Sequence, residues 1–175
     1  EGQALDKEFE NNQTITESMY LDMIDKKTGA LLGASAVLPM IYNGESKETI
    51  QKFEKFGRCL GKGFQIHDDL LEITANTTIM GKSLGSDIIE GKQTMLVIKA
   101  RKNFPDEWMK LLNNTNELRF VDNISSFFND TGIIKETKLI ANEFFKSCLE
   151  LLNEIDDIEK KYLIQLVNLI KKRTY

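Results

Sequence analysis

The sequence contains little proline, cysteine or histidine, and each shortage excludes or disfavours a class of structure or site. Two prolines in 175 residues leave long stretches of backbone in which a helix need not break. The two cysteines, Cys59 and Cys148, lie far apart, so neither a zinc-binding pattern nor a disulfide framework is expected. Isolated cysteines fit a reducing compartment, and we expect a cytoplasmic protein.

A basic surface and a membrane segment are also missing. The net charge of −4 and the pI of about 5.2 argue against the broad basic face that nonspecific nucleic-acid binding needs. The longest apolar run, residues 29–42, is interrupted by Pro39 and is too short to span a bilayer. The first residues lack a signal-peptide pattern and an initiator methionine, so we expect the chain to begin inside a longer protein.

What the sequence does contain is apolar periodicity close to 3.6 residues, with almost no β-branched alternation. Apolar residues make up 41 % of the chain, which is enough for one domain with a sizeable core. These features predict an all-α fold. The expected helices cover residues 3–11, about 14–42, 47–74, 94–102, a segment from Pro105, about 117–128, and two more at the C-terminal end.

Local signals mark several helix ends and faces. Thr14 and Glu17 have the spacing of a capping box, and Ser46 is a plausible N-cap after the Asn43-Gly44 turn. The second helix is expected to bury one side, formed by Tyr20, Met23, Ile24, Leu31, Ala34 and Leu38, with a kink near Pro39. The last two helices are expected to bury Ile140, Phe144, Cys148, Leu151 and Ile155, and Leu163, Leu166, Val167 and Ile170.

Three acidic residues continue an apolar stripe in the helix over residues 47–74. The stripe consists of Ile50, Phe53, Gly57, Leu60, Gly61 and Phe64. Asp68 falls in the middle of this face and Glu72 one turn later, with Gln65 and Asp69 beside them. Carboxylates on a core-facing stripe are costly without positive compensation, and this spacing lets their oxygens converge on a hard cation such as Mg²⁺.

The same segment admits a plainer interpretation, in which the helix emerges into solvent and its acidic residues are ordinary surface groups. Gly57 and Gly61 are interpreted as close helix-packing positions. His67, the single histidine, points away from the acidic face and is expected to be structural or solvent-facing rather than a ligand.

Lysines supply the matching positive charge. Lys27 and Thr28 interrupt the apolar side of the second helix, which indicates either a polar cleft or a lysine that extends to solvent at the stripe's edge. Lys82 and Lys92 lie on either side of Asp87 in a segment with several glycines, which can fold over a phosphate or form a solvated loop. Together these residues indicate carboxylates that hold magnesium, with magnesium and lysines that hold a diphosphate beside apolar helices.

In this combination the sequence resembles the trans-isoprenyl (polyprenyl) diphosphate synthases of the geranylgeranyl type. Phe64-Gln65 followed by Asp68-Asp69-Leu70-Leu71-Glu72 resembles the family's second aspartate-rich motif. The other matching elements, in family order, are Gly2-Gln3 with Asp6, Lys27-Thr28-Gly29-Ala30-Leu31, Gly81-Lys82 through Gly85-Ser86-Asp87, and Glu90-Gly91-Lys92-Gln93-Thr94. The resemblance implies an isoprenoid-synthase fold, with antiparallel helices around a deep central cleft.

Two departures from the family pattern matter. Glu72 stands where aspartate is commonest; its longer arm can still reach a metal, with a changed geometry. The first aspartate-rich motif and the basic residues for isopentenyl diphosphate are absent. Residues 1–175 are therefore expected to be the C-terminal part of a single polyprenyl synthetase domain, with its N-terminal part as a partner.

The resemblance implies condensation of an allylic diphosphate with isopentenyl diphosphate through an allylic carbocation, in a homodimer that uses Mg²⁺. It assigns magnesium to Asp68, Asp69 and Glu72, with Asp87 as an outer helper, and the allylic diphosphate to Lys27, Lys82 and Lys92. Thr28 and Gln65 would turn oxygen dipoles toward the carbocation. The alternatives are a terpene cyclase of the same fold and a noncatalytic partner subunit of a prenyl synthase.

Overall fold

The computed structural model describes residues 1–74, 85–113, 119–155 and 159–173, and within these ranges every regular element is helical. The predicted all-α class is confirmed. The elements are α1 (Gly2–Phe9), α2 (Glu17–Ile24), the π-helix η1 (Asp25–Gly29), α3 (Ala30–Tyr42), α4 (Lys47–Thr74), α6 (Ser86–Ile89), α7 (Met95–Asn103), α8 (Pro105–Leu112), α9 (Phe120–Asp130), α10 (Ile133–Asn153) and α11 (Lys161–Lys172).

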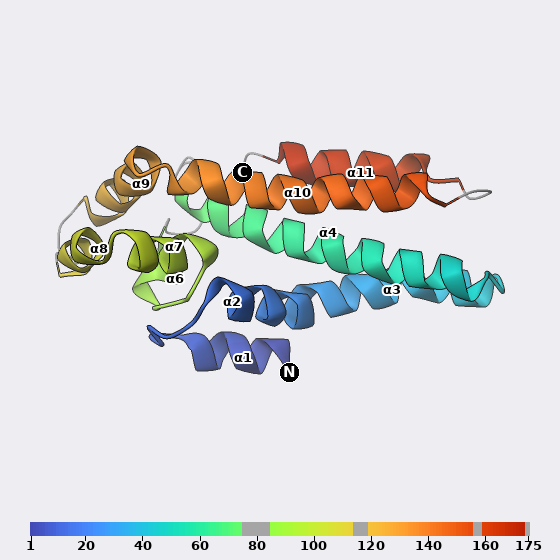
Figure 1. The fold of residues 1–175 in the computed structure, drawn as a ribbon, viewed down its shortest axis with the longest axis horizontal. Coiled ribbons are helices and arrows are strands. Elements are labelled where there is room, and N and C mark those ends of the chain that lie inside the picture. The colour runs from blue at the N-terminus through green and yellow to red at the C-terminus, as the bar shows by residue number, and fades with distance from the viewer. Residues whose placement is uncertain (75–84, 114–118, 156–158, 174–175) are drawn as a thin grey trace.

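The long helix α4 runs through the middle of the molecule (Figure 1). On one side of it lie α1, α2, η1 and α3, and on the other lie α10 and α11, while α6 to α9 gather beyond its C-terminal end. Its predicted bounds are confirmed, and so is its N-cap, because the Ser46 hydroxyl oxygen accepts from the Thr49 backbone N–H at 3.1 Å.

Two apolar clusters hold these helices together. The larger joins α4 to α2, α10 and α11 and is centred on side chains such as Phe53, Ile66 and Phe145. The smaller joins the end of α4 to α7, α8 and α9, where the Trp108 ring stacks on Phe128 at 5.6 Å between centroids. Both ends of α4 are thereby fixed, which gives its carboxylates a rigid support.

On the other side, α4 meets α3 and η1 through glycines, as the sequence analysis predicted. A Cβ at Gly57 would lie 2.4 Å from the Leu32 carbonyl oxygen, and one at Gly61 would lie 2.6 Å from the Gly29 Cα. Any larger side chain at these two positions would push the helices apart.

The predicted inward side of the second helix is only half right. Tyr20, Met23 and Ile24 are buried, whereas Leu31 and Leu38 are 70 % and 65 % exposed. The cause is η1, because a π-turn takes an extra residue and so rotates everything that follows around the helix axis. The side chains that pack on the core after this turn are Leu32, Ala36 and Met40.

Three smaller predictions also need correction. The N-cap of α2 is Thr16, whose hydroxyl accepts from the Met19 N–H at 3.3 Å, and Thr14 instead bonds to the Asn12 side chain. Leu166 of α11 is exposed, although Val167 is fully buried. Of the row predicted near the C-terminal end of α10, Cys148 and Ile155 are buried as predicted, whereas Ile140, Phe144 and Leu151 are only partly buried. The buried residues of α10 are Ile133, Thr137, Ala141, Phe145, Cys148 and Leu152.

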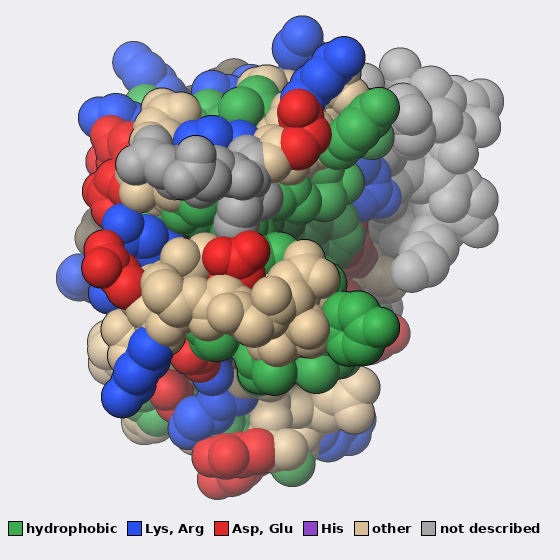
Figure 2. Space-filling view, turned by 90° about the vertical axis from the view of Figure 1, so that its right-hand side faces the viewer, with side chains coloured by type: hydrophobic (Ala, Val, Ile, Leu, Met, Phe, Trp, Pro, Cys, Tyr) green, Lys and Arg blue, Asp and Glu red, His purple; other side chains and the backbone are tan. Residues whose placement is uncertain are grey.

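The surface carries both signs of charge. Viewed from the end where α3 connects to α4, acidic, basic and hydrophobic side chains are interspersed (Figure 2). Within the described ranges, no helix combines the length and the apolar character needed to cross a membrane.

Candidate active site

A polar cavity of about 260 Å³ lies where α1, α2 and η1 face the C-terminal half of α4, α6 and the segment before α7. It brings together residues from three parts of the chain that are far apart in the sequence: residues 6–27, 65–72 and 87–94. Its lining residues are Asp6, Tyr20, Met23, Ile24, Lys27, Gln65, Asp68, Asp69, Glu72, Asp87, Lys92, Gln93 and Thr94. Most of the candidates from the sequence therefore share one cavity.

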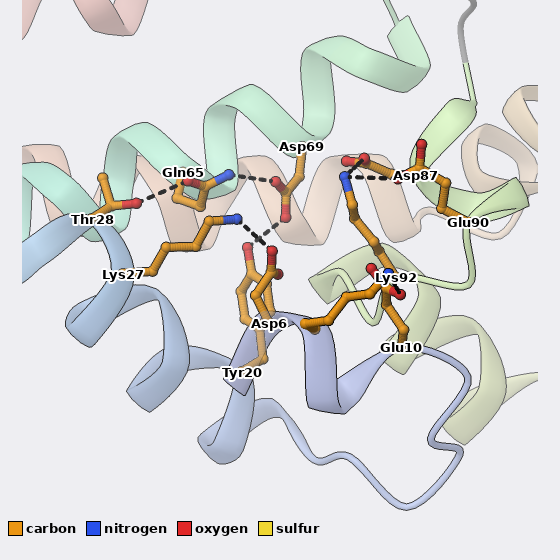
Figure 3. A network of polar contacts seen from close by, with 11 residues as sticks. Asp6, Glu10, Tyr20, Lys27, Thr28, Gln65, Asp69, Asp87, Glu90 and Lys92 are labelled. Carbon is orange, nitrogen blue, oxygen red and sulfur yellow. Dashed lines mark hydrogen bonds and ion pairs between the residues drawn. The ribbon is translucent and has the colours of Figure 1, made fainter. Parts of the chain in front are cut away.

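The deepest carboxylate of the cavity is Asp69. Its Oδ2 accepts from the Tyr20 hydroxyl at 2.6 Å, and its Oδ1 accepts from the Gln65 amide at 3.0 Å (Figure 3). Burial raises the pKa of Asp69 to about 7, although the hydrogen bonds from Tyr20 and Gln65 act to lower it. This side chain therefore changes its charge near neutral pH.

Asp68 lies closer to solvent than the apolar stripe predicted. Its side chain is 45 % exposed, and its Oδ1 accepts from Arg173 Nη1 at 3.1 Å. The middle of the buried face is occupied by Asp69 instead, because α4 is covered by α2 on one side and by α10 on the other. The expectation that Asp68 sits at the centre of the face is wrong, although Asp68 does line the cavity.

Glu72 and Asp87 form the edge of the cavity next to α6. Glu72 Oε1 accepts from the Ser86 hydroxyl at 2.6 Å and from the Asp87 backbone N–H at 2.9 Å, which ties the end of α4 to the start of α6. Burial acts to raise the pKa of Glu72, but the hydrogen bonds from Asp87 and Ser86 lower it below its usual value. Asp87 in turn pairs with Lys92, which also lies 3.3 Å from Glu90.

The π-helix η1 presents Lys27 and Thr28 to the same region. Lys27 Nζ lies 2.7 Å from Asp6 Oδ2 of α1, and the Thr28 hydroxyl donates to Gln65 Oε1 at 3.0 Å (Figure 3). The close approach of α1 depends on Gly2, where a Cβ would lie 2.2 Å from the Lys27 backbone nitrogen. Thr28, Gln65 and Asp69 thus form one chain of hydrogen bonds beside the Lys27–Asp6 ion pair.

The predictions for Lys82 and His67 have different outcomes. Lys82 falls outside the described residues. His67 is half-buried, its Nε2 donates to the Arg173 carbonyl oxygen at 2.8 Å, and its ring packs edge-on against Phe145, so its predicted structural role is confirmed.

Tyr20 and Arg173 touch the carboxylates directly, although the sequence predicts no site role for either. Tyr20 was assigned to the apolar core, where it does lie, but a buried tyrosine hydroxyl needs a hydrogen-bond partner and thus signals a nearby acceptor. Arg173 lies 105 residues after Asp68, and no local pattern connects them.

The donors around the cavity suit magnesium in kind, since Asp68, Asp69, Glu72 and Asp87 offer only carboxylate oxygens. In the part of the chain that the structure describes, no three acidic, histidine or cysteine side chains converge as metal ligands. Each of the four carboxylates is held by a donor from another residue. The carboxylates fit the cation chemically. To bind it, their oxygens would have to be shared with, or released by, the side chains that now donate hydrogen bonds to them.

Comparison with known proteins decides the family. A family model described as polyprenyl synthetase matches residues 1–130, which include every candidate residue. The chain belongs to the polyprenyl synthetase family. The resemblance inferred from the second aspartate-rich motif is confirmed.

Members of the polyprenyl synthetase family match the chain along its whole length. It is 35 % identical to a geranylgeranyl pyrophosphate synthase of Geoglobus acetivorans, over 100 % of this chain and 54 % of that protein. It is 33 % identical to a short chain isoprenyl diphosphate synthase of Methanothermobacter thermautotrophicus, over 95 % of this chain and 52 % of that protein. The chain therefore spans about half the length of the curated relatives it matches.

Solved structures of the family share the fold. The heptaprenyl diphosphate synthase of Staphylococcus aureus superposes with a TM-score of 0.88 at 25 % identity, over 99 % of this chain and 56 % of that one. The all-α isoprenoid-synthase fold is therefore confirmed.

Proposed function

We propose that this chain supplies the allylic-diphosphate side of the active site of a trans-polyprenyl diphosphate synthase of the geranylgeranyl type. The observation that supports this most is the cavity itself, where four carboxylates from α4 and α6 face Lys27 and Lys92 next to the apolar side chains of Met23 and Ile24. Magnesium and ammonium groups would together bind a diphosphate, and the apolar wall suits a hydrocarbon.

The reaction would be head-to-tail condensation. The allylic C–O bond breaks, diphosphate leaves, the allylic carbon bonds to isopentenyl diphosphate, and the released diphosphate takes the proton that the product loses. Bound magnesium, held by Asp68, Asp69 and Glu72 with Asp87 behind them, would neutralise charge on the leaving group.

The side chains of this chain would bind and orient the substrate. Lys27 and Lys92, with Lys82, would donate to diphosphate oxygens as negative charge grows there. Because the Thr28 hydroxyl gives its hydrogen to Gln65, its lone pairs remain available to face positive charge. Thr28 and Gln65 would in this way direct oxygen dipoles toward the allylic carbocation.

The test is an assay of the full-length protein with magnesium, an allylic diphosphate and labelled isopentenyl diphosphate. We expect an elongated product, and about thirtyfold or greater loss of kcat/KM for Lys27→Met or Lys92→Met, which is about 2 kcal/mol of transition-state stabilisation. The matched control is Lys26→Met, because Lys26 pairs with Glu1 and Asp22 away from the cavity and should leave turnover unchanged.

Other products would contradict the proposal in distinct ways. A cyclised hydrocarbon without uptake of label would indicate a terpene cyclase, and no turnover without a second subunit would indicate a partner role. We also expect residues 1–175 alone to be inactive, because they carry one aspartate-rich motif and no recognised isopentenyl diphosphate site. Homodimerisation and a cytoplasmic location stay predictions.

A further inference from the structure

The residue that follows α11 lies against α4 beside the carboxylates, next to Asp68. Arg173, directly after α11, donates from Nη1 to Asp68 at 3.1 Å, and its guanidinium lies 5.9 Å from the centre of the Phe64 ring. Its carbonyl oxygen accepts from His67 Nε2 at 2.8 Å. Positions 64, 67 and 68 share one face of α4, so three separate contacts hold this arginine over a single helical turn.

The contact puts a positive charge on an oxygen of the cavity. Asp68 lines the cavity, and its carboxylate and the Arg173 guanidinium are both partly exposed, at 45 % and 35 %. A divalent cation bound to the same carboxylate would be repelled by the guanidinium at this short range. A cation bound at Asp68 would therefore compete with Arg173 for this carboxylate.

We propose that Arg173 is a positioning residue of the cation site, which holds the Asp68 carboxylate and compensates its charge when no metal is bound. This inference rests on the proposed function, because it takes Asp68 to be a cation ligand. It has a direct consequence for binding: a divalent cation must displace the guanidinium, so the protein without this pair binds the cation more tightly.

The experiment measures Mn²⁺ binding to the full-length protein from the electron paramagnetic resonance signal of free Mn²⁺, which requires no turnover. For Arg173→Gln we expect binding that is roughly two- to fivefold tighter, the range set by a partly exposed ion pair. Arg173→Lys keeps the charge and should stay near the wild-type affinity. The control Lys172→Gln removes an exposed charge one residue away and should change nothing.

Folding and site identity are tested in parallel. Arg173→Met keeps part of the side-chain stem over Phe64 and serves as a second uncharged variant, with thermal unfolding recorded for each protein. The whole series is repeated in an Asp68→Asn background, where the effect of Arg173→Gln should vanish if it acts through Asp68.

The outcomes separate the two hypotheses. If Asp68→Asn does not weaken Mn²⁺ binding, Asp68 is not a cation ligand and the metal site of the proposed function is wrong. If Asp68→Asn weakens binding but the uncharged variants at position 173 bind Mn²⁺ as the wild type does, or more weakly, the inference about Arg173 is overturned and the proposed function stands. An effect of Arg173→Gln that persists in the Asp68→Asn background overturns it as well.

Discussion

Helices α3 and α10 lie on opposite sides of α4, and they contact it in different ways. Helix α10 carries charges on its outer side and buries a row of side chains, among them Phe145 and Leu152 at 1 % and 0 % exposure. Helix α3 has no charged residue, yet the one position it buries is Gly33. Several of its large apolar side chains remain exposed, including Leu38 and Tyr42.

The difference shows which of the two neighbours of α4 has its apolar face covered by residues of this chain. α10 is an amphipathic helix whose apolar face is covered, whereas α3 approaches α4 through glycines and leaves most of its apolar surface uncovered. Apolar surface of this extent commonly marks a contact with another molecule or segment. We expect this face to be covered in the full-length protein by another segment or molecule.

The largest effect should come from the α10 side. Phe145→Ala removes a fully buried ring between α4 and α10, and we expect it to lower the free energy of unfolding by about 3–5 kcal/mol. Urea unfolding followed by circular dichroism measures this change. Leu139→Ala on the exposed side of α10 is the matched control and should cost less than about 0.5 kcal/mol. Similar losses for the two variants would show that α10 does not anchor α4.

A pair of glycines on α4 sharpens the comparison. Gly57→Ala places a methyl group 2.4 Å from the backbone of α3, which cannot move without separating the helices, and should cost about 1–3 kcal/mol. Gly63→Ala on the other side meets the side chains of Phe145 and Phe144, at 2.9 and 3.2 Å, and these can shift. We expect the smaller loss for Gly63→Ala in the same urea experiment. The reverse order would mean that the α3 contact is the more adaptable one.

Sequence periodicity predicted α4 with its bounds because its apolar stripe, its N-cap and its glycines all agree. It failed on α3 because the rule assumes 3.6 residues per turn throughout, and the π-turn at residues 25–29 breaks that count. An inserted residue in the turn leaves no mark in composition. The same turn presents Lys27 and Thr28 to the candidate site, so the error falls on a segment that the proposed function uses.

The sequence predicted most of the charged residues that line the cavity, but not how deeply each of them is buried. The spacing shows only that Asp68 and Asp69 point to neighbouring sides of one helix. The packing of α2 and α10 against α4 determines that Asp69 is the buried one. The Tyr20 hydroxyl on Asp69 and the Arg173 guanidinium on Asp68 come from distant parts of the chain. Such contacts depend on the tertiary fold, which a local pattern does not contain.

Burial of Asp69 predicts a pH effect on stability when no metal is present. The pKa of Asp69 is about 7 in the folded state and about 4 in an unfolded chain, so the folded state binds this proton more tightly. The contribution of the bound proton to the free energy of unfolding is therefore fully present below pH 4 and is lost as the pH rises through 7. Asp69→Asn should therefore stabilise the protein at pH 8 by on the order of 1–2 kcal/mol, since either Tyr20 or Gln65 then loses an acceptor and offsets part of the gain.

The measurement is urea unfolding in EDTA at pH 5 and pH 8. The advantage of Asp69→Asn should shrink at pH 5, where the wild-type side chain is largely protonated. Asp68→Asn is the matched control, because its half-exposed carboxylate is paired with Arg173 and should gain nothing from neutralisation. An advantage at pH 8 that is equal for the two variants would contradict the burial argument.

The smallest effect on stability should come from the open face of α3. Leu31 and Leu38 are 70 % and 65 % exposed in residues 1–175, so the double change to serine removes little buried area and should alter the free energy of unfolding by less than about 0.5 kcal/mol at low protein concentration. It should reduce self-association, which sedimentation velocity measures, because these side chains form part of the uncovered apolar surface. The control is Leu166→Ser on α11, which changes an exposed leucine on a helix that lies on the other side of α4. In the full-length protein the same double change should instead lower stability or turnover, since this face is then covered. An identical response of the two proteins would show that α3 remains open in both and that the contrast with α10 has no functional meaning.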